Sequence, residues 1–214
     1  MLIILKKIYM QCNKELALQK LKKFLDSIKK LKKSEWLFLK TLASYKKVKK
    51  GEVILKAGDV CNNIYFVCSG LLRGYIINKD GRDYTWHIFF NNEFAIQSNL
   101  WAVDYESFLK KTKSKITIEV LKDSELLVFS RNKIEMVFKT HIGAVLGMII
   151  SQEAYCILHN YVISYVTEEA IDRFRNFMRT SSHWFDLVPQ KYIATHLGIA
   201  PESLSRLKRQ FNSE

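Results

Sequence analysis

The sequence predicts an α+β protein in which an N-terminal antiparallel β-roll is followed by one long helix and a C-terminal helix-turn-helix. Three observations predict this fold. Short β-rich runs separated by glycine-containing turns fill residues 50–131, an uninterrupted helical pattern covers residues 142–166, and two short helices joined at a glycine end the chain. With 214 residues, two prolines and 48% hydrophobic residues, the chain can bury a large core and does not have a disordered composition.

The N-terminal segment is predicted to be helical and is strongly basic. Apolar residues recur at helical spacing over residues 14–31, and Ser34 followed by Glu35 marks the start of a second, short helix. Residues 1–50 contain 15 lysines and 3 acidic residues, whereas the remaining segments are close to neutral. This basic face could attract DNA phosphates or an anionic membrane, but a solvated lysine face is the simpler interpretation. Net charge therefore does not locate a nucleic-acid site.

The middle of the chain has the pattern of an antiparallel barrel or double sheet. Asn78 to Gly81 form a good hairpin turn, and further glycines separate the other β-rich runs. We expect strands at residues 53–55, 64–67, 71–77, 84–90, 116–120 and 126–129. Six short strands at this spacing are typical of a closed or two-layered antiparallel sheet, which encloses a core and sometimes a ligand.

We expect a short helix at residues 133–139 and, after it, a long helix at residues 142–166. Ile157 and Leu158 lie off its main apolar seam, so the helix should be covered on more than one side. Packing on the roll and pairing with a second subunit would satisfy both faces, whereas a core helix of a monomer is the alternative. The residues of the predicted dimer seam are Val145, Met148, Ile149, Gln152, Tyr155, Cys156, His159 and Val162.

Residues 189–211 carry the most specific pattern of the chain. Pro189 and Pro201 each stand where a helix would begin, and Pro201 suits a first helical turn because its missing N–H needs no partner there. Glycine tolerates a left-handed backbone, so Gly198 suits the turn between two helices. Ala194 is small enough to lie where the two helices cross closely. An ordinary α-hairpin is the alternative. The positions expected to lock a helix-turn-helix are Ile193, Ala194, Leu197, Gly198, Ile199, Leu204 and Leu207.

The second helix of this unit is expected to enter the major groove of double-stranded DNA. Arg206 can donate two hydrogen bonds to guanine and Glu202 can accept one from cytosine, although Glu202 would also stabilise a helix N-terminus without touching a base. We therefore predict base-reading roles for Glu202, Ser205, Arg206 and Arg209, and phosphate-binding roles for Gln190, Lys191, Ser203 and Lys208.

The order of these elements over residues 15–211 resembles the Crp/Fnr transcription regulators, and residues 188–206 resemble the form common in Bacteroidetes-type bacteria. The resemblance implies a cytoplasmic homodimer with a cyclic-nucleotide-binding-like jelly roll as sensor and with RNA polymerase as a further candidate partner. Glu202 and Arg206 fall where the family's base-reading residues lie, and Ser203 falls where a phosphate-binding threonine is usual. The implied units are a sensor (residues 1–141), a dimerisation helix (142–166) and a DNA-binding domain (167–214).

The chain departs from the cyclic-AMP-binding members of this family. Ile96 and Gln97 stand where those members have a Gly-Glu pair, and the arginine position falls near Ser114. We keep Ile96, Gln97, Ser98 and Ser114 as a candidate effector pocket but do not expect cyclic AMP to bind in the usual way, so the small-molecule effector is unidentified. Pro201 replaces an arginine found in some members, which predicts a different DNA target.

Other function classes have weaker support. The sequence has no phosphate loop and no HExxH or GxSxG motif, so we expect neither an enzyme nor a bound cofactor. The apolar runs at residues 1–5 and 142–150 are too short to span a bilayer, which predicts no membrane insertion. The alternative function is a signalling or scaffold protein whose roll contacts a partner or a membrane surface. Four scattered cysteines predict reduced thiols and no metal site: Cys12, Cys61, Cys68 and Cys156.

Overall fold

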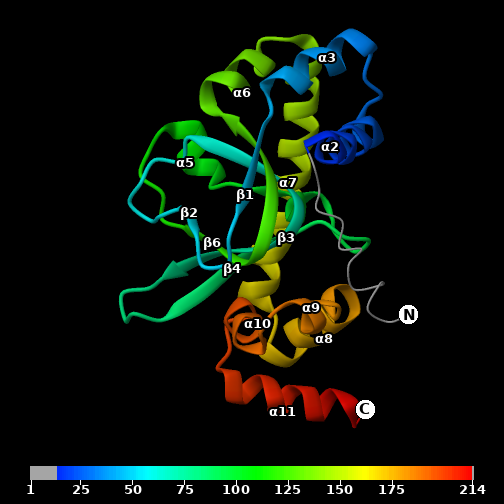
Figure 1. Cartoon of the computed structure of the whole chain (residues 1–214). Helices are drawn as coiled ribbons and strands as arrows, with labels where there is room; N and C mark the ends of the chain where they lie inside the picture. Colours follow the sequence, from blue (N-terminus) through cyan, green and yellow to red (C-terminus); the bar gives the residue numbers. More distant parts are fainter. Residues whose placement is uncertain (1–13, 214) are drawn as a thin grey trace, which may run out of the picture.

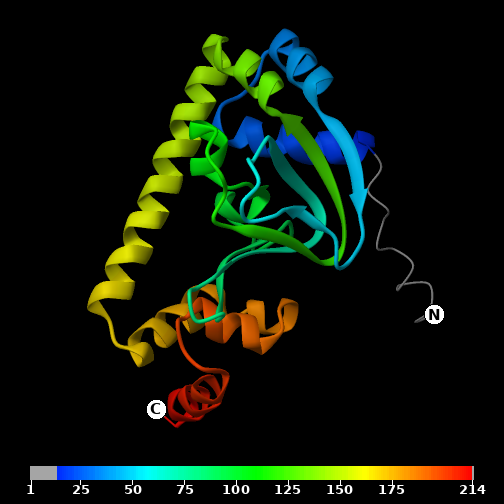
Figure 2. The ribbon, with the colours of Figure 1, turned by 90° about the vertical axis from the view of Figure 1, so that its left-hand side faces the viewer.

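The computed structural model describes residues 14–213, which fold into a β-roll with helices at both ends (Figure 1). The N-terminal helices lie at one end of the roll and the C-terminal helices lie at the other. One long helix runs beside the roll and links the two ends, as the rotated view in Figure 2 shows. Cys12 lies outside the described residues.

Two helices precede the roll, as expected. They are α2 (Lys14–Ile28) and α3 (Lys33–Leu42). The apolar face of α2 is buried, while most of its lysines are at least partly exposed. Helix α3 begins with a cap in which the Glu35 carboxylate accepts a hydrogen bond from the Lys32 backbone N–H at 2.7 Å.

The roll is an antiparallel jelly roll built around two long strands. The sheet order is β1 (Ser44–Val48), β6 (Thr117–Ser130), β3 (Asn63–Ile77) and β4 (Asp83–Phe90). Two short strands complete it, because β2 (Val53–Leu55) pairs with β6 and β5 (Trp101–Ala102) pairs with β3. The hairpin turn at Asn78 to Gly81 joins β3 to β4, as predicted.

Four of the predicted strands form only two strands in the structure. Residues 64–67 and 71–77 belong to β3, and residues 116–120 and 126–129 belong almost entirely to β6. The chain bends within each strand at register shifts instead of ending there. Gly70 makes one bend possible, since its φ is 97° and a Cβ there would lie 2.6 Å from the Ser124 Cα. Strand β1 was not predicted, because consecutive lysines hide its alternating pattern.

Short elements that the sequence did not predict close one side of the roll. They are α4 (Gln97–Leu100) and α5 (Tyr105–Lys110), which are too short to show helical periodicity. Side-chain hydrogen bonds hold them: the Asn99 amide donates to the Ile88 carbonyl at 2.9 Å, and Asp104 caps α5 by accepting from the Ser107 N–H at 3.2 Å. This side of the roll faces the long helix.

The C-terminal part is entirely helical. After α6 (Arg131–Phe138), the helix α7 runs without a break over His141–Thr167. By length and composition alone α7 could cross a membrane, although only its first turns are buried in this chain. The apolar run at residues 142–150, expected to be too short to span a bilayer, is part of this longer helix, and one such helix is weak evidence for a membrane span. The last helices are α8 (Ala170–Ser181), α9 (Trp184–Leu187), α10 (Gln190–His196) and α11 (Pro201–Asn212).

Candidate nucleic-acid interface

Helices α10 and α11 are joined by a tight turn that the sequence explains. Gly198 follows α10 in the left-handed conformation, with φ of 70°. The Ile199 N–H donates to the Ala194 carbonyl at 3.0 Å and the Gly198 N–H donates to the Thr195 carbonyl at 3.2 Å. These two bonds form a Schellman motif, which ends α10 and redirects the chain into α11. Pro201 occupies the first turn of α11, as predicted.

An apolar core holds the two helices to the rest of this unit. Phe174 of α8 and Ile193 are completely buried, and the Phe174 ring meets the Phe211 ring edge-on at 5.9 Å. Ile199 is half-buried against the same core, while Gly198 is exposed in the turn. The other five of the seven positions expected to lock the motif are buried: Ile193, Ala194, Leu197, Leu204 and Leu207.

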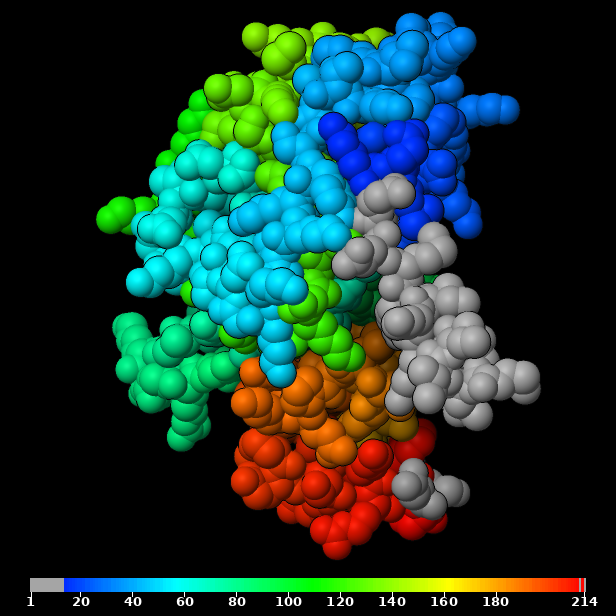
Figure 3. All heavy atoms as spheres, in the orientation of Figure 1, coloured from blue at the N-terminus to red at the C-terminus, as the bar shows by residue number. Residues whose placement is uncertain are grey.

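The opposite face of α11 points away from the molecule. Glu202, Ser205, Arg206 and Arg209 are all exposed. These four residues share the exposed side of the helix, whereas Leu204 and Leu207 occupy its buried side. Figure 3 shows α11 as the outermost layer at one end of the molecule, with α10 between it and the roll. The four predicted base-reading side chains are therefore brought to one accessible surface.

The four predicted phosphate-binding residues differ in their exposure. Gln190 and Lys191 are exposed at the start of α10, whereas Ser203 and Lys208 are half-buried. The Lys208 ammonium lies 4.3 Å from the centre of the Phe185 ring, so this side chain turns back onto its own domain.

The C-terminal helical unit is docked on the roll through polar contacts that the sequence did not reveal. Thr85 of β4 and Thr195 of α10 share a hydrogen bond of 2.7 Å between their hydroxyls. The Arg73 guanidinium, only 1% exposed, lies 3.8 Å from the centre of the Tyr192 ring of α10. Residues from such distant parts of the chain carry no shared sequence pattern, so only the tertiary structure identifies this junction.

Two half-buried histidines, His87 and His196, lie at the same junction. The Nδ1 of His196 is 3.1 Å from the Thr85 carbonyl oxygen. Burial lowers the pKa of His87 to about 4, with a smaller contribution from repulsion by His196. Burial also lowers the pKa of His196, so both rings are neutral near pH 7. On α7, burial raises the pKa of Tyr161 to about 12, and its hydroxyl donates to the His196 carbonyl at 3.1 Å.

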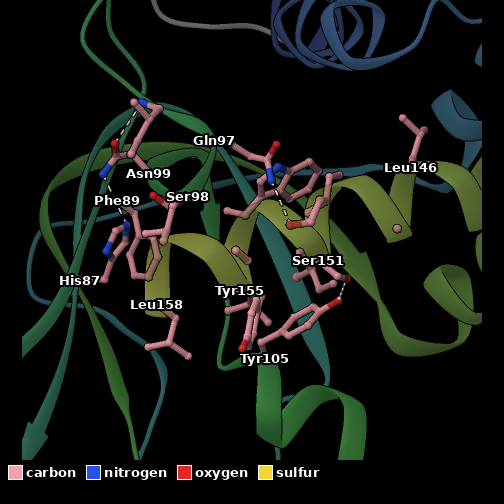
Figure 4. A pocket seen from close by; sticks show the side chains of 18 of the residues that line it. His87, Phe89, Gln97, Ser98, Asn99, Tyr105, Leu146, Ser151, Tyr155 and Leu158 are labelled. Atoms are coloured by element: carbon pink, nitrogen blue, oxygen red, sulfur yellow. Dashed lines mark hydrogen bonds between the residues drawn. The ribbon is translucent and has the colours of Figure 1, made fainter. Parts of the chain in front are cut away.

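The candidate effector residues separate into two places. Ile96, Gln97 and Ser98 line a cavity of about 990 Å³ between the roll and α7, part of which is seen in Figure 4. Ser114 does not line this cavity: it is buried elsewhere in the roll, where its hydroxyl donates to Asp104 at 2.7 Å. The prediction that Ser114 belongs with the other three is wrong, because the chain between them folds into α4, β5 and α5.

The outer face of α7 is apolar and exposed in the single chain. Met148 is 54% exposed and Val162 is 48% exposed, and Val145 and Ile149 are half-buried. Gln152, Cys156 and His159 are also exposed. Tyr155, predicted to lie in the same seam, also lines the cavity and is 67% exposed. The helix thus presents one side to the roll and leaves most of the predicted seam exposed.

Among residues 14–213, no group of three or more His, Cys, Asp or Glu side chains lies close enough together to hold a metal ion. Cys61 is buried and Cys156 is exposed, and neither forms a disulfide with a described cysteine.

Comparison with known proteins agrees with this architecture. Residues 45–141 match the family model of the cyclic nucleotide-binding domain. A putative Crp/Fnr regulator from Eubacterium rectale superposes with a TM-score of 0.63 at 19% identity, covering 86% of this chain and 84% of the other. The chain has the Crp/Fnr fold.

Two further solved structures show the same fold. The c-di-GMP-responsive regulator CLP of Xanthomonas campestris gives a TM-score of 0.64 at 14% identity, covering 85% of this chain and 92% of the other. FixK2 of Bradyrhizobium japonicum gives a TM-score of 0.64 at 15% identity, covering 80% of this chain and 85% of the other. No curated protein sequence matches the chain. The Crp/Fnr fold places the β-roll, the long helix and the C-terminal helices in one established arrangement.

Proposed function

We propose that this chain is a sequence-specific DNA-binding regulator of transcription. One observation carries the proposal: a tightly turned helix pair holds Glu202 and Arg206 on its solvent face at the end of the molecule. In such a pair the second helix enters the major groove with the residues near its N-terminus against the bases. Arg206 would read guanine through two parallel hydrogen bonds, and Glu202 would accept from cytosine.

The remaining predicted contacts surround these two. Ser205 and Arg209 lie exposed on the same helix and would extend the base contacts along the groove. Gln190, Lys191 and Ser203 would contact phosphates and thereby set the orientation of α11. Lys208 would have to leave the Phe185 ring to reach a phosphate, so we expect it to contribute least.

We also propose that two copies pair through α7 and act in the cytoplasm. The exposed apolar side chains of α7, including Met148, Val162 and the 76%-exposed Val166, need a partner surface. A two-fold pair would present two α11 helices about 34 Å apart, which suits a palindrome with half-sites one DNA turn apart. RNA polymerase is a further proposed partner.

The sensor is proposed not to bind cyclic AMP in the usual way. Among the described residues that line the cavity, none is Lys or Arg, and Lys113 and Lys115 are exposed and do not line it. A cyclic phosphate buried there would lack a counter-charge, which is strongly unfavourable.

An Arg206→Ala variant tests the regulator proposal. Wild-type protein first selects bound sequences from a random DNA pool, and fluorescence anisotropy then measures affinity for the consensus and its single-base variants. The expected result is a loss of about 1–3 kcal/mol that disappears when one particular base pair is already mutated. Arg179→Ala, an exposed arginine of α8, is the control and should bind like wild type. Failure of the selection, or an equal loss on every sequence, would contradict base reading by Arg206.

A further inference from the structure

The cavity between the roll and α7 is a candidate small-molecule site, separate from the candidate nucleic-acid interface. Its wall is shared by the roll, α7 and the C-terminal unit: Trp86 and Trp101 come from β-strands, Tyr155 comes from α7, and Trp184 and His196 come from α9 and α10. Its volume of about 990 Å³ is at the upper end of the range for small-molecule sites, about 300–1,000 Å³. Figure 4 shows side chains of α4, α5 and α7 meeting around it.

The wall is apolar and uncharged. Among the described lining residues none is Asp, Glu, Lys or Arg. Two half-buried histidines of the wall, His87 and His196, have lowered pKa values because partial burial disfavours their charged forms. A charged ligand would lose its hydration there without gaining a counter-charge. The chemistry of the wall therefore selects against anions and cations alike.

Unpartnered polar atoms are concentrated in the same wall. Four buried side-chain polar atoms of the described residues have no hydrogen-bond partner, and three belong to residues that line the cavity. They are the Ser98 Oγ, the Trp101 Nε1 and the His183 Nε2. The His183 ring also stacks on Phe94 with ring centres 4.8 Å apart. These three atoms are closed to solvent, so they lie behind the surface of the wall and are not offered to a ligand. The surface that a ligand meets is mainly apolar.

We infer that this cavity binds an uncharged, mainly apolar small molecule. The molecule lies against the aromatic side chains of the wall and against α7.

The position of the cavity connects the ligand to the C-terminal unit. Thr180 and Ser181 of α8, with His183 and Trp184 beside them, line the same cavity as the roll residues. A bound molecule would touch both the roll and the unit that carries α11. A role of this molecule as an effector rests on the proposed DNA-binding function, whereas its binding in the cavity does not.

A matched pair of dyes tests the binding. N-phenylnaphthylamine is neutral, and anilinonaphthalene sulfonate is the same ring system with one negative charge. We expect saturable binding of one neutral dye per chain and affinity for the sulfonate lower by about ten-fold or more, because the cavity offers the charge no partner. The net charge of +13 would favour the sulfonate in any non-specific binding, so this order of affinities distinguishes the cavity from the general surface.

Two alanines of α7 give matched variants. Ala154 lines the cavity and Ala144 does not, and both are exposed on the same helix. Ala154→Phe should abolish binding of the neutral dye while Ala144→Phe preserves it, with circular dichroism checking the fold of each. Equal loss in both variants, or a sulfonate that binds as tightly as the neutral dye, overturns the inference.

Fluorine NMR of fluorotryptophan-labelled wild-type protein provides a readout that needs no substitution. Trp86, Trp101 and Trp184 line the cavity, whereas Trp36 lies on α3 outside it. The neutral dye should shift three resonances and leave that of Trp36 unchanged. If the dye shifts none of the three, or if a second copy of the chain covers the cavity and prevents binding, the inference is wrong. DNA anisotropy with and without dye then tests the effector role separately, because dye binding is measured without DNA.

Discussion

Replacing Arg73 by leucine removes the buried charge that joins the roll to the C-terminal helical unit. The buried guanidinium of this β3 residue donates to the Glu119 carboxylate at 3.1 Å and to the Thr85 hydroxyl at 2.9 Å, and it also pairs with Asp83. Its flat face lies 3.8 Å from the centre of the Tyr192 ring. Leucine fills part of the space but leaves two carboxylates facing each other without a cation.

The size of the effect follows from these contacts. Removing one partner of a buried ion pair typically costs about 3–5 kcal/mol of folding free energy. The Glu119 side chain is 24% exposed and the Asp83 side chain is 40% exposed, so water relieves part of the penalty. Loss of the cation–π contact to Tyr192 adds about 1 kcal/mol. We expect a total near the lower end, about 3 kcal/mol, which lowers Tm by about 6–12 °C for a chain of this length.

Thermal and urea unfolding followed by circular dichroism measure this loss. Arg82→Leu is the control, because Arg82 is exposed and its substitution should change stability by less than about 0.5 kcal/mol. A double-mutant cycle with Tyr192→Leu should give a coupling of about 1 kcal/mol across the junction. A loss below about 1 kcal/mol for Arg73→Leu, or no coupling to Tyr192, would refute the view that this arginine holds the two units together.

Three further predictions concern other parts of the molecule. The pKa of His87 in the folded chain, about 4, lies below its ordinary 6.5, so stability is full above pH 6.5 and falls as the pH drops towards 4. Up to about 3 kcal/mol should be lost, and His87→Gln should remove this part of the pH dependence in urea titrations. Gly198→Ala should destabilise by about 2 kcal/mol or more, because the added methyl would meet a tyrosine hydroxyl of α7 at 2.4 Å. The control Gly81→Ala, also at positive φ but in open space, should cost only about 1 kcal/mol; equal losses would exclude the contact as the cause. Val162→Glu should convert a dimer into monomers in light scattering while the exposed polar control Asn160→Glu does not, and a wild-type monomer would contradict pairing through α7.

The elements with long or specific patterns could be predicted from the sequence. The long proline-free sequence of α7 and the combination of Gly198 with Pro201 each favour a local backbone geometry, so neighbouring residues alone carry the signal. The division of β3 and β6 into separate strands was wrong, since a bulge and a turn look alike when the partner strand is unknown. The short α4 and α5 escaped prediction because four to six residues are too few to establish a period.

The sequence by itself determined the order of the elements and which side chains of α11 face the solvent, because helical periodicity is a local property of the chain. Only the tertiary structure decided which distant residues meet. It placed Arg73 against Tyr192, separated Ser114 from Ile96, and gathered three tryptophans around one uncharged cavity. Such contacts depend on how the roll and the helices pack, and packing brings together residues whose separation along the chain leaves no periodic trace.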